Sequence, residues 1–330
     1  MRLLMLITAV VLGGMTPVAA NALLGGLFTR SVAASAPAAS TASAAPAVKA
    51  SGSVSALTVP KPVTPKPADA QIDDWIDRLS KEPKFEAWKN ASWSKYPIGP
   101  GNHGWVVIVK DAASGMETGY LVVWETENGT LQLEEYGIGD LPLFSQRTLS
   151  WALGSEGLEG VKFTKKAAVE RIYFDALHAY WKVSEGKITR YADAKTGEWL
   201  PIGERELLSL AEVPSPQGER TGAGAGAKSV HVLAKRVADP YMNIAWITGK
   251  PISIRGWNDL LKTLGGKDEA PVYRADLFDG LMMVPMGVAG VHAWKANVGN
   301  EALDSFVAVE QEGLRYIPFD RLAANGSFVH

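Results

Sequence analysis

The sequence contains no cysteine among its 330 residues. This absence excludes disulfide bonds, thiolate ligands for a metal and a cysteine nucleophile. Histidine is scarce as well: five are present, and none belongs to an H-E-x-x-H motif, which places two zinc ligands on one face of a helix. No G-x-S-x-G motif, the sharp turn that exposes a catalytic serine, occurs either. The sequence therefore predicts no metal site, no cofactor and no catalytic residue.

Neither sign of charge dominates the chain. It has 33 basic and 35 acidic residues, which gives a formal net charge of −2. A charge so close to zero gives no reason to expect nucleic acid or an anionic membrane surface as a partner. Hydrophobic residues make up 47% of the sequence and charged residues 21%, so a chain of this length can bury one or two hydrophobic cores.

An apolar stretch near the start of the sequence predicts export. Arg2 is followed by thirteen mostly apolar residues, Leu3–Met15, and then by the small-residue pattern that ends at Ala22. This order is typical of a secretory signal peptide over residues 1–22. The alternative is an uncleaved signal anchor that extends to about residue 28, which Pro17 disfavours. Both interpretations place the rest of the chain outside the cytoplasm, secreted or at the cell surface and envelope, with membrane contact only through an uncleaved N-terminal segment.

Two segments have the composition of linkers. Residues 23–68 consist largely of alanine, serine, proline, valine and threonine, and residues 31–68 contain no aromatic residue. Such a segment buries too little apolar surface to offset an ordering cost of about 1–2 kcal/mol per residue, so we expect it to be disordered. Residues 212–229, rich in glycine, alanine and proline, form the second predicted linker.

The first predicted domain, residues 69–211, begins with a helix. Apolar residues at helical spacing place Ile72, Trp75, Ile76 and Leu79 on one buried stripe. After Pro83, Phe85 and Trp88 indicate a second short helix. A further helix is expected over Ser145–Leu153, and residues 96–104 are expected to be loop. Alternating apolar residues then predict strands: Trp105–Val109, Tyr120–Trp124, Leu131–Tyr136 and Val169–Tyr173.

The second predicted domain, residues 230–330, is expected to hold a helix over Gly256–Leu264. Its expected strands are Val272–Ala275, Leu281–Val284, Val291–Trp294, Ser305–Val309 and Arg315–Pro318. The fold class is therefore α+β: two small domains, each an antiparallel sheet with packed helices, after a disordered N-terminal segment rich in alanine, serine and proline.

A hairpin lies at the centre of the first domain. Ala179–Val183 and Lys187–Ala192 alternate apolar and polar residues, as a half-buried antiparallel pair does. The motif Trp181-Lys182-Val183, followed by Tyr191-Ala192-Asp193-Ala194-Lys195-Thr196-Gly197-Glu198, resembles the closing hairpin of a PepSY domain, over residues 177–201. The resemblance implies a small α+β module of a secreted or envelope protein that binds or restrains a partner. The alternative is an ordinary hairpin with a polar turn.

One loop has the residues of a binding site. His103 lies in a segment rich in glycine and proline, and aromatic residues on a loop beside a rigid sheet commonly form a ligand site. In the alternative interpretation, the glycines and prolines shape the turn and the imidazole caps a backbone group. The predicted ligand-binding residues are Trp93, Tyr96, Asn102, His103 and Trp105.

The segment Gly290-Val291-His292-Ala293-Trp294 resembles the histidine strand of papain-like C39-type peptidases. Those enzymes need a cysteine thiolate that this histidine activates, and the sequence has no cysteine. The resemblance therefore implies at most an inactive peptidase fold.

Taken together, these patterns predict an exported, non-catalytic binding or regulatory protein of the bacterial envelope or extracellular space, with a protein or cell-wall component as its partner. Two alternatives stay open. One is a secreted hydrolase or an inactive protein of papain-like peptidase fold. The other is a glycan-binding cell-wall protein, since all eleven tryptophans follow residue 70 and flat rings can stack on sugars.

Overall fold

The computed structural model describes residues 68–101, 103–127, 129–155, 162–164, 166–212, 228–234, 236–266, 269–295 and 302–330. The predicted signal peptide, residues 23–67, Asn102 and most of the 212–229 linker lie outside the described residues. Within the described ranges, no helix is both long enough and apolar enough to cross a membrane.

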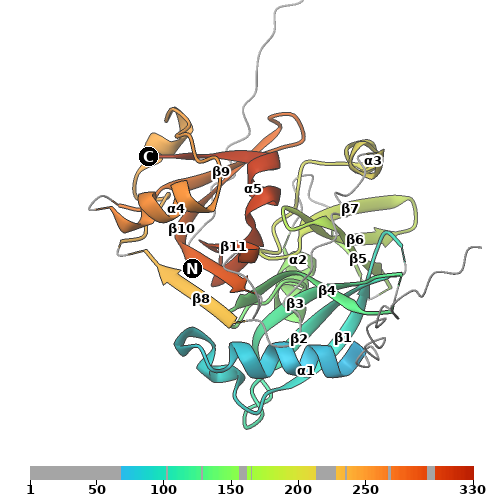
Figure 1. Ribbon diagram of the computed structural model, residues 1–330. Helices are drawn as coiled ribbons and strands as arrows, with labels where there is room; N and C mark the ends of the chain where they lie inside the picture. The colour runs from blue at the N-terminus through green and yellow to red at the C-terminus, as the bar shows by residue number, and fades with distance from the viewer. Residues whose placement is uncertain are drawn as a thin grey trace, which may run out of the picture. The chain divides into compact units, whose positions relative to one another are not determined.

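The predicted α+β class is confirmed: antiparallel sheets carry a small number of helices (Figure 1). Ten strands of the described chain form one large sheet. They are β1 (Ser92–Ile98), β2 (Gly104–Lys110), β3 (Glu117–Glu125), β4 (Leu131–Ile138), β8 (Lys228–Leu233), β9 (Val272–Leu277), β10 (Met282–Lys295), β11 (Ala302–Glu310), β12 (Leu314–Pro318) and β13 (Gly326–Val329). Their order is β1-β2-β3-β4-β12-β11-β10-β9-β13, and β8 pairs with β10.

The expected central hairpin forms within a second sheet of the described chain. This sheet has the order β5 (Ala168–Asp175), β6 (His178–Glu185) and β7 (Ile188–Asp193). Trp181 pairs with Ala192 across β6 and β7. Gly186 and Gly197 have φ values of 62° and 77° at the two turns, a conformation that glycine adopts at little cost.

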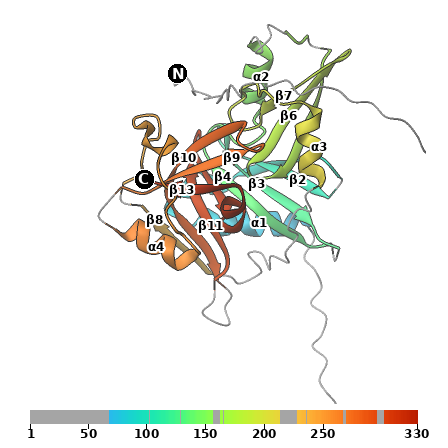
Figure 2. The same ribbon diagram turned by 90° about the horizontal axis from the view of Figure 1, so that it is seen from above.

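The large sheet takes strands from both sides of the 212–229 segment (Figures 1 and 2). β4 pairs antiparallel with β12, with Tyr136 opposite Tyr316 and Ile138 opposite Leu314. Without this partner, β4 would leave a row of backbone N–H and C=O groups unpaired. The two segments that the sequence predicts as separate domains therefore contribute to one sheet.

Two expectations about strands are wrong. Leu281–Val284 and Val291–Trp294 belong to one long strand, β10, and the irregularity between Val288 and Gly290 bends it. β9 pairs with its first half and β8 with its second half. The loop expected over residues 96–104 is shorter at both ends, because β1 continues to Ile98 and β2 begins at Gly104.

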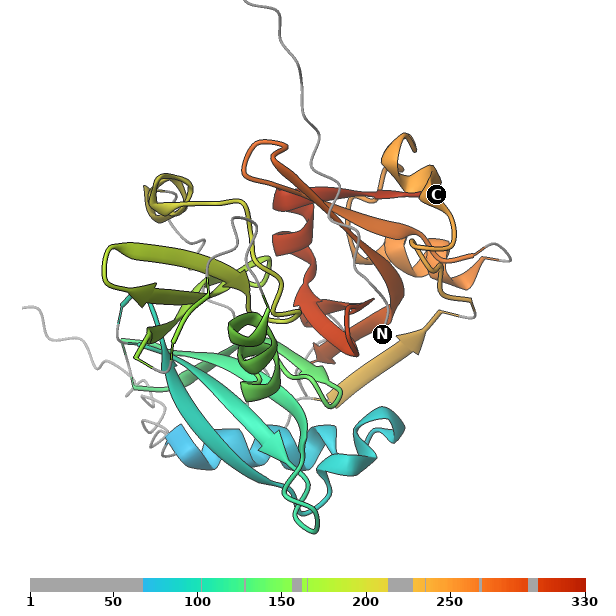
Figure 3. The same cartoon turned by 180° about the vertical axis from the view of Figure 1, so that it is seen from behind.

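The helix α1 (Ala68–Leu79) covers one face of the large sheet together with the 3₁₀ helix η1 (Pro83–Trp88). In Figure 3 these two elements lie along one side of β1–β4, and the three-stranded sheet lies on the other side. The predicted stripe is confirmed, since Ile72, Trp75, Ile76 and Leu79 are all buried. On the opposite face, apolar residues of β2 and β3 pack against those of β6.

The remaining helices of the described chain are short. α2 (Gln146–Gly154) follows β4, and α3 (Glu204–Glu212) follows β7. The segment between β8 and β9 contains the 3₁₀ helix η2 (Ile244–Ile247) and α4 (Trp257–Gly265), and α5 (Phe319–Asn325) follows β12. Leu260 and Leu264 of α4 and Leu322 of α5 are buried in the core of the C-terminal strands.

Buried ion pairs connect the N-terminal and C-terminal strands. A bulge in the pairing of β3 with β4 falls at the adjacent residues Glu134 and Glu135, and both side chains are buried. Arg315 of β12 donates to the Glu135 carboxylate at 3.0 and 3.2 Å. Arg321 of α5 donates to Glu134 at 2.9 Å. A buried charge is tolerated only when it is paired and hydrogen-bonded, so this arrangement fixes how the strands meet.

A buried lysine extends this network. The Lys195 Nζ, in the turn after β7, donates to the backbone oxygens of Leu141 and Glu312, the second at 2.9 Å. Burial lowers the pKa of Lys195 to about 7. The side chain thus joins the segment after β4, the end of the hairpin and the β11–β12 turn.

Removing one partner of the buried pair should destabilise the protein strongly. Arg315→Met leaves the Glu135 carboxylate buried without its counter-ion, which costs about 3–5 kcal/mol. Chemical denaturation would measure the loss, and Arg315→Met combined with Glu135→Gln should recover part of it. Arg255→Met breaks the exposed pair with Asp259 and should cost far less, because water screens an exposed ion pair. Equal losses for the two single variants would contradict the role of the buried pair.

Candidate functional site

The residues predicted to form a loop site lie on two faces of the sheet. Trp93 and Trp105 pack on the face that α1 covers, whereas Tyr96 packs on the opposite face. The cause is strand β1: successive side chains point to opposite faces, so residues 93 and 96 diverge. Trp93 Nε1 donates to Asp73 at 2.8 Å, and the Arg171 guanidinium lies 4.6 Å from the Tyr96 ring centroid.

His103 is exposed, and its backbone oxygen accepts a hydrogen bond of 2.7 Å from the Glu125 N–H. Asn102 lies outside the described residues. Of the five predicted site residues, Trp93 and Trp105 pack against the same cluster beneath α1. They are not neighbours there, because Trp105 lies opposite Pro97, four residues along β1 from Trp93.

His292 is fully buried on β10 among aromatic rings. It stands directly across from His231 of β8, with ring centroids 5.1 Å apart. Its Nδ1 forms a hydrogen bond with the Tyr136 hydroxyl, and His231 Nε2 lies 3.1 Å from the Tyr316 hydroxyl. Burial, and then the neighbouring His231, lower the pKa of His292 to about 3. This neutral imidazole, enclosed by aromatic rings, contributes to core packing, and a substrate cannot reach it.

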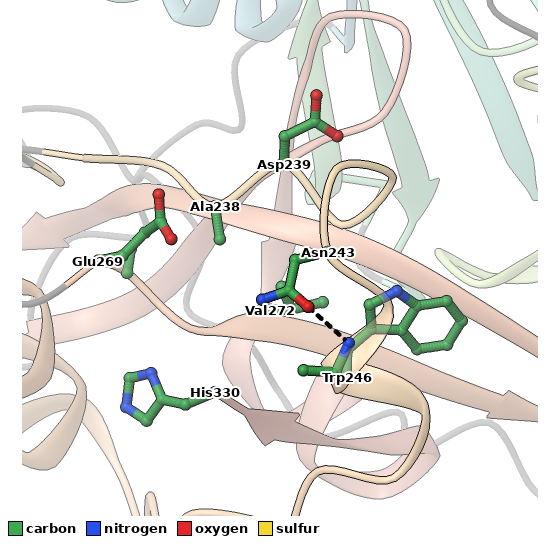
Figure 4. Close-up of a pocket in the computed structure, with 9 residues that line it drawn as sticks. Ala238, Asp239, Asn243, Trp246, Glu269, Val272 and His330 are labelled. Carbon is green, nitrogen blue, oxygen red and sulfur yellow. Dashed lines mark hydrogen bonds between the residues drawn. The ribbon is translucent and has the colours of Figure 1, made fainter.

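A surface pocket of 340 Å³ lies elsewhere, in the segment between β8 and β9 (Figure 4). In Figure 4, Glu269 and His330 lie on one side of the pocket and the Trp246 indole on the other. The lining residues are Ala238, Asp239, Asn243, Ala245, Trp246, Glu269, Ala270, Val272 and His330.

The loop that forms one wall of this pocket is held in place by specific contacts. The Asn243 side chain caps η2 by accepting from the Ala245 N–H at 2.9 Å. Trp246 is buried, and its Nε1 donates to the Pro240 oxygen at 2.8 Å. Arg274 of β9 donates to the backbone oxygens of Trp246 and Ile247 at 2.9 and 3.0 Å. The sheet therefore sets the position of the loop.

The charged groups that line the pocket are carboxylates. Glu269 is half exposed and forms an ion pair with Arg236, with 3.9 Å between the guanidinium nitrogen and the carboxylate oxygen. Asp239 accepts a hydrogen bond of 2.9 Å from the Tyr241 N–H. The pocket thus combines these two carboxylates with apolar walls.

The same loop exposes large apolar side chains. Tyr241 is 42% exposed, Met242 83% and Ile244 66%. Partial burial, and then the carboxylates of Glu198, Glu312 and Asp239, raise the pKa of Tyr241 to about 12. Three exposed apolar residues within four positions, on a fixed loop beside a pocket, are typical of an interaction surface. We call Tyr241, Met242 and Ile244 the apolar rim.

The sequence prediction missed this site. The segment from 234 to 256 has neither helical nor strand periodicity, so the sequence predicts no helix or strand in it before Gly256. The available signal was local: large apolar residues at 241, 242 and 244 stand between Asp239-Pro240 and Asn243, which favour turns. Neither Glu269 nor His330 could be joined to them from spacing, because β9 and β13 bring these residues together only in the fold.

Comparisons with protein-family models, with curated proteins and with solved structures find no match for this chain. The PepSY-like and papain-like resemblances therefore stay predictions. Over the part of the chain that the structure describes, no group of three or more histidine, aspartate or glutamate side chains is placed to hold a metal ion.

Replacing His292 by asparagine should reduce the loss of stability in acid. The ordinary pKa of 6.5 is lowered to about 3 in the folded protein, so between these values the unfolded chain binds a proton that the folded chain does not. The stabilising effect of the neutral ring is present above 6.5 and is lost as the pH falls. Between about pH 7 and about pH 4.5 the wild-type free energy of unfolding should fall by roughly 2 kcal/mol more than that of His292→Asn. Urea denaturation checks this, and equal pH slopes would contradict it.

Proposed function

We propose that this protein is an exported, non-catalytic binding protein whose partner docks at the apolar rim and the adjacent pocket. The observation that carries the proposal is the rim itself: Tyr241, Met242 and Ile244 are exposed on a loop that Trp246 and Arg274 hold in position. Exposing apolar side chains to water is unfavourable, and a contiguous group of them commonly marks a binding surface.

The pocket chemistry favours binding over catalysis. Of the described residues that line it, the polar ones are Asp239, Asn243, Glu269 and His330, and none of these is a serine, threonine or lysine that could act as a nucleophile. The two histidines with suggestive sequence surroundings lie away from this pocket: His103 is exposed on the β1–β2 loop, and His292 is enclosed by rings.

Export and the framework belong to the same proposal. The pattern in residues 1–22 supports secretion or placement at the cell surface, and the composition of residues 23–67 supports a tether between the folded part and an anchor. The PepSY-like hairpin of β6 and β7 would act as framework, since it packs on the large sheet through Trp181 and Val183.

Serine substitutions in the apolar rim should abolish partner capture. The Met242→Ser, Ile244→Ser double variant is immobilised and exposed to envelope or extracellular material. The amount of partner that it retains should be at least about tenfold lower than for the wild type, because the apolar contact is lost. Quantitative mass spectrometry of the retained material provides the measurement.

The matched control is Met116→Ser with Leu208→Ser, which removes two apolar residues of 56% and 60% exposure outside the rim. It should retain the partner like the wild type. A component that the wild type, the rim variant and the control all retain equally would refute the proposed site.

Mass spectrometry of the intact protein from cell fractions tests export separately. A mass that begins at Leu23 is expected after cleavage following Ala22, and a full-length mass in the membrane fraction would indicate the anchor. Full-length protein in the cytoplasmic fraction would contradict export.

A further inference from the structure

Arg171 is held in one position by both its backbone and its side chain. It lies on β5, directly opposite Trp181 of β6. Its backbone also meets the end of β1: the Gly99 N–H donates to the Arg171 oxygen at 2.8 Å, and the Gly99 oxygen accepts from the Tyr173 N–H. The guanidinium carbon lies 4.6 Å from the Tyr96 ring centroid and 5.0 Å from that of Trp181. The guanidinium therefore needs little ordering when a ligand binds.

This guanidinium lacks an acceptor within the chain. Among the described residues, every other arginine that is buried or half-buried donates to an oxygen atom of the protein. These arginines are Arg78, Arg190, Arg274, Arg315 and Arg321. Arg171 is half-buried too, yet within the described ranges its guanidinium forms no hydrogen bond and no ion pair, and its Nε is enclosed without a partner. Because such a group is costly to leave unsatisfied, an acceptor from outside the chain would stabilise it.

The accessible side of the guanidinium is its terminal fork. Of the three Arg171 nitrogens, Nε is the one that is both enclosed and unpartnered, so a ligand reaches the two terminal nitrogens. Two parallel N–H donors in one plane match the two oxygens of a carboxylate, and this bidentate, charge-assisted pair is among the stronger hydrogen-bonded contacts.

The charge around Arg171 favours an anion with a single negative charge. Burial lowers the pKa of Arg171, and the Tyr96 phenol opposes this effect; among the described residues no second cation and no carboxylate contributes. The guanidinium nevertheless stays charged, because arginine is not deprotonated in proteins. Phosphate groups are typically bound by clusters of arginines or by helix N-termini, whereas one guanidinium matches one carboxylate.

An exposed apolar side chain lies next to the fork. Val169 precedes Arg171 by two residues on β5, so both side chains point to the same face of the sheet. Val169 pairs with Val183 and is 36% exposed. A ligand that carries an apolar group beside its carboxylate would bury this valine further, which adds a favourable contact.

We propose that the terminal fork of Arg171 binds the carboxylate of a ligand whose adjacent apolar group packs on Val169. Neither residue lines the pocket beside the apolar rim, so this site goes beyond the proposed function and does not depend on it. The end of a peptide chain and a small organic acid both present this chemistry.

Nuclear magnetic resonance titrations of the isotope-labelled full chain test the proposal with defined probes. N-acetylleucine should bind at least about tenfold more tightly than N-acetylleucinamide, because the amide keeps the apolar group and loses the charged acceptor. Inorganic phosphate should bind more weakly than N-acetylleucine. An acetylated tripeptide that ends in leucine distinguishes the two sources: tighter binding than N-acetylleucine indicates a chain end, and equal affinity indicates a small acid.

Three protein variants locate the effect. Arg171→Met keeps an aliphatic stem against Trp181 and should weaken N-acetylleucine by at least about tenfold, to the affinity of the amide. Arg171→Lys keeps the charge without the fork and should weaken it by at least about threefold. The matched control, Arg205→Met, removes an exposed arginine of α3 and should leave the affinity unchanged.

Thermal unfolding of each variant checks that it is folded, and the comparison of acid with amide needs the wild type alone. Equal affinity for N-acetylleucine and its amide, no binding of N-acetylleucine, tighter binding of phosphate, or an identical effect of Arg171→Met and Arg205→Met would overturn the proposal. Wild-type affinity in Arg171→Lys would overturn the role of the fork.

Discussion

Two adjacent buried carboxylates constrain how this chain folds. Glu134 and Glu135 lie at a bulge of β4, and an isolated buried carboxylate in such a place would cost several kcal/mol, a large part of the net stability of a domain. Arg321 and Arg315 neutralise them, and both arginines lie nearly 200 residues later in the chain. The counter-ions of these two carboxylates of β4 therefore come from the C-terminal segment. This requirement explains why one sheet runs through both halves.

That sheet also provides the support for the candidate site. β9 lies near the far end of the strand order from β1, and its Arg274 holds the loop that carries Trp246 and Asn243. Glu269 precedes β9, and His330 follows β13, which pairs with β9. A loop fixed by a rigid sheet can keep apolar side chains in water at defined positions, and binding residues in proteins commonly occupy such loops. A ligand would meet a surface that needs little ordering on binding.

The residues of the predicted loop site and those of the observed pocket are entirely different. Tryptophan and tyrosine near a glycine-rich loop predict a binding site, but aromatic residues occur both in hydrophobic cores and in ligand sites. Here, strand alternation sends Trp93 and Trp105 beneath α1, where they exclude water from the core. The pocket residues are chemically plainer, and two of them, Asp239 and Asn243, are turn formers. They line a pocket only because the fold places Glu269 beside them.

The sequence by itself determined the local structure. Helical spacing predicted the buried stripe of α1, and alternation with glycine turns predicted β6 and β7, because these patterns depend on neighbours within a few residues. Only the tertiary structure decided that β4 pairs with β12, that two predicted strands form one β10, and that Glu269 stands beside residues 238–246. Those outcomes depend on hydrogen bonds and charges between residues far apart in the chain, and no short-range pattern records which distant partner satisfies them.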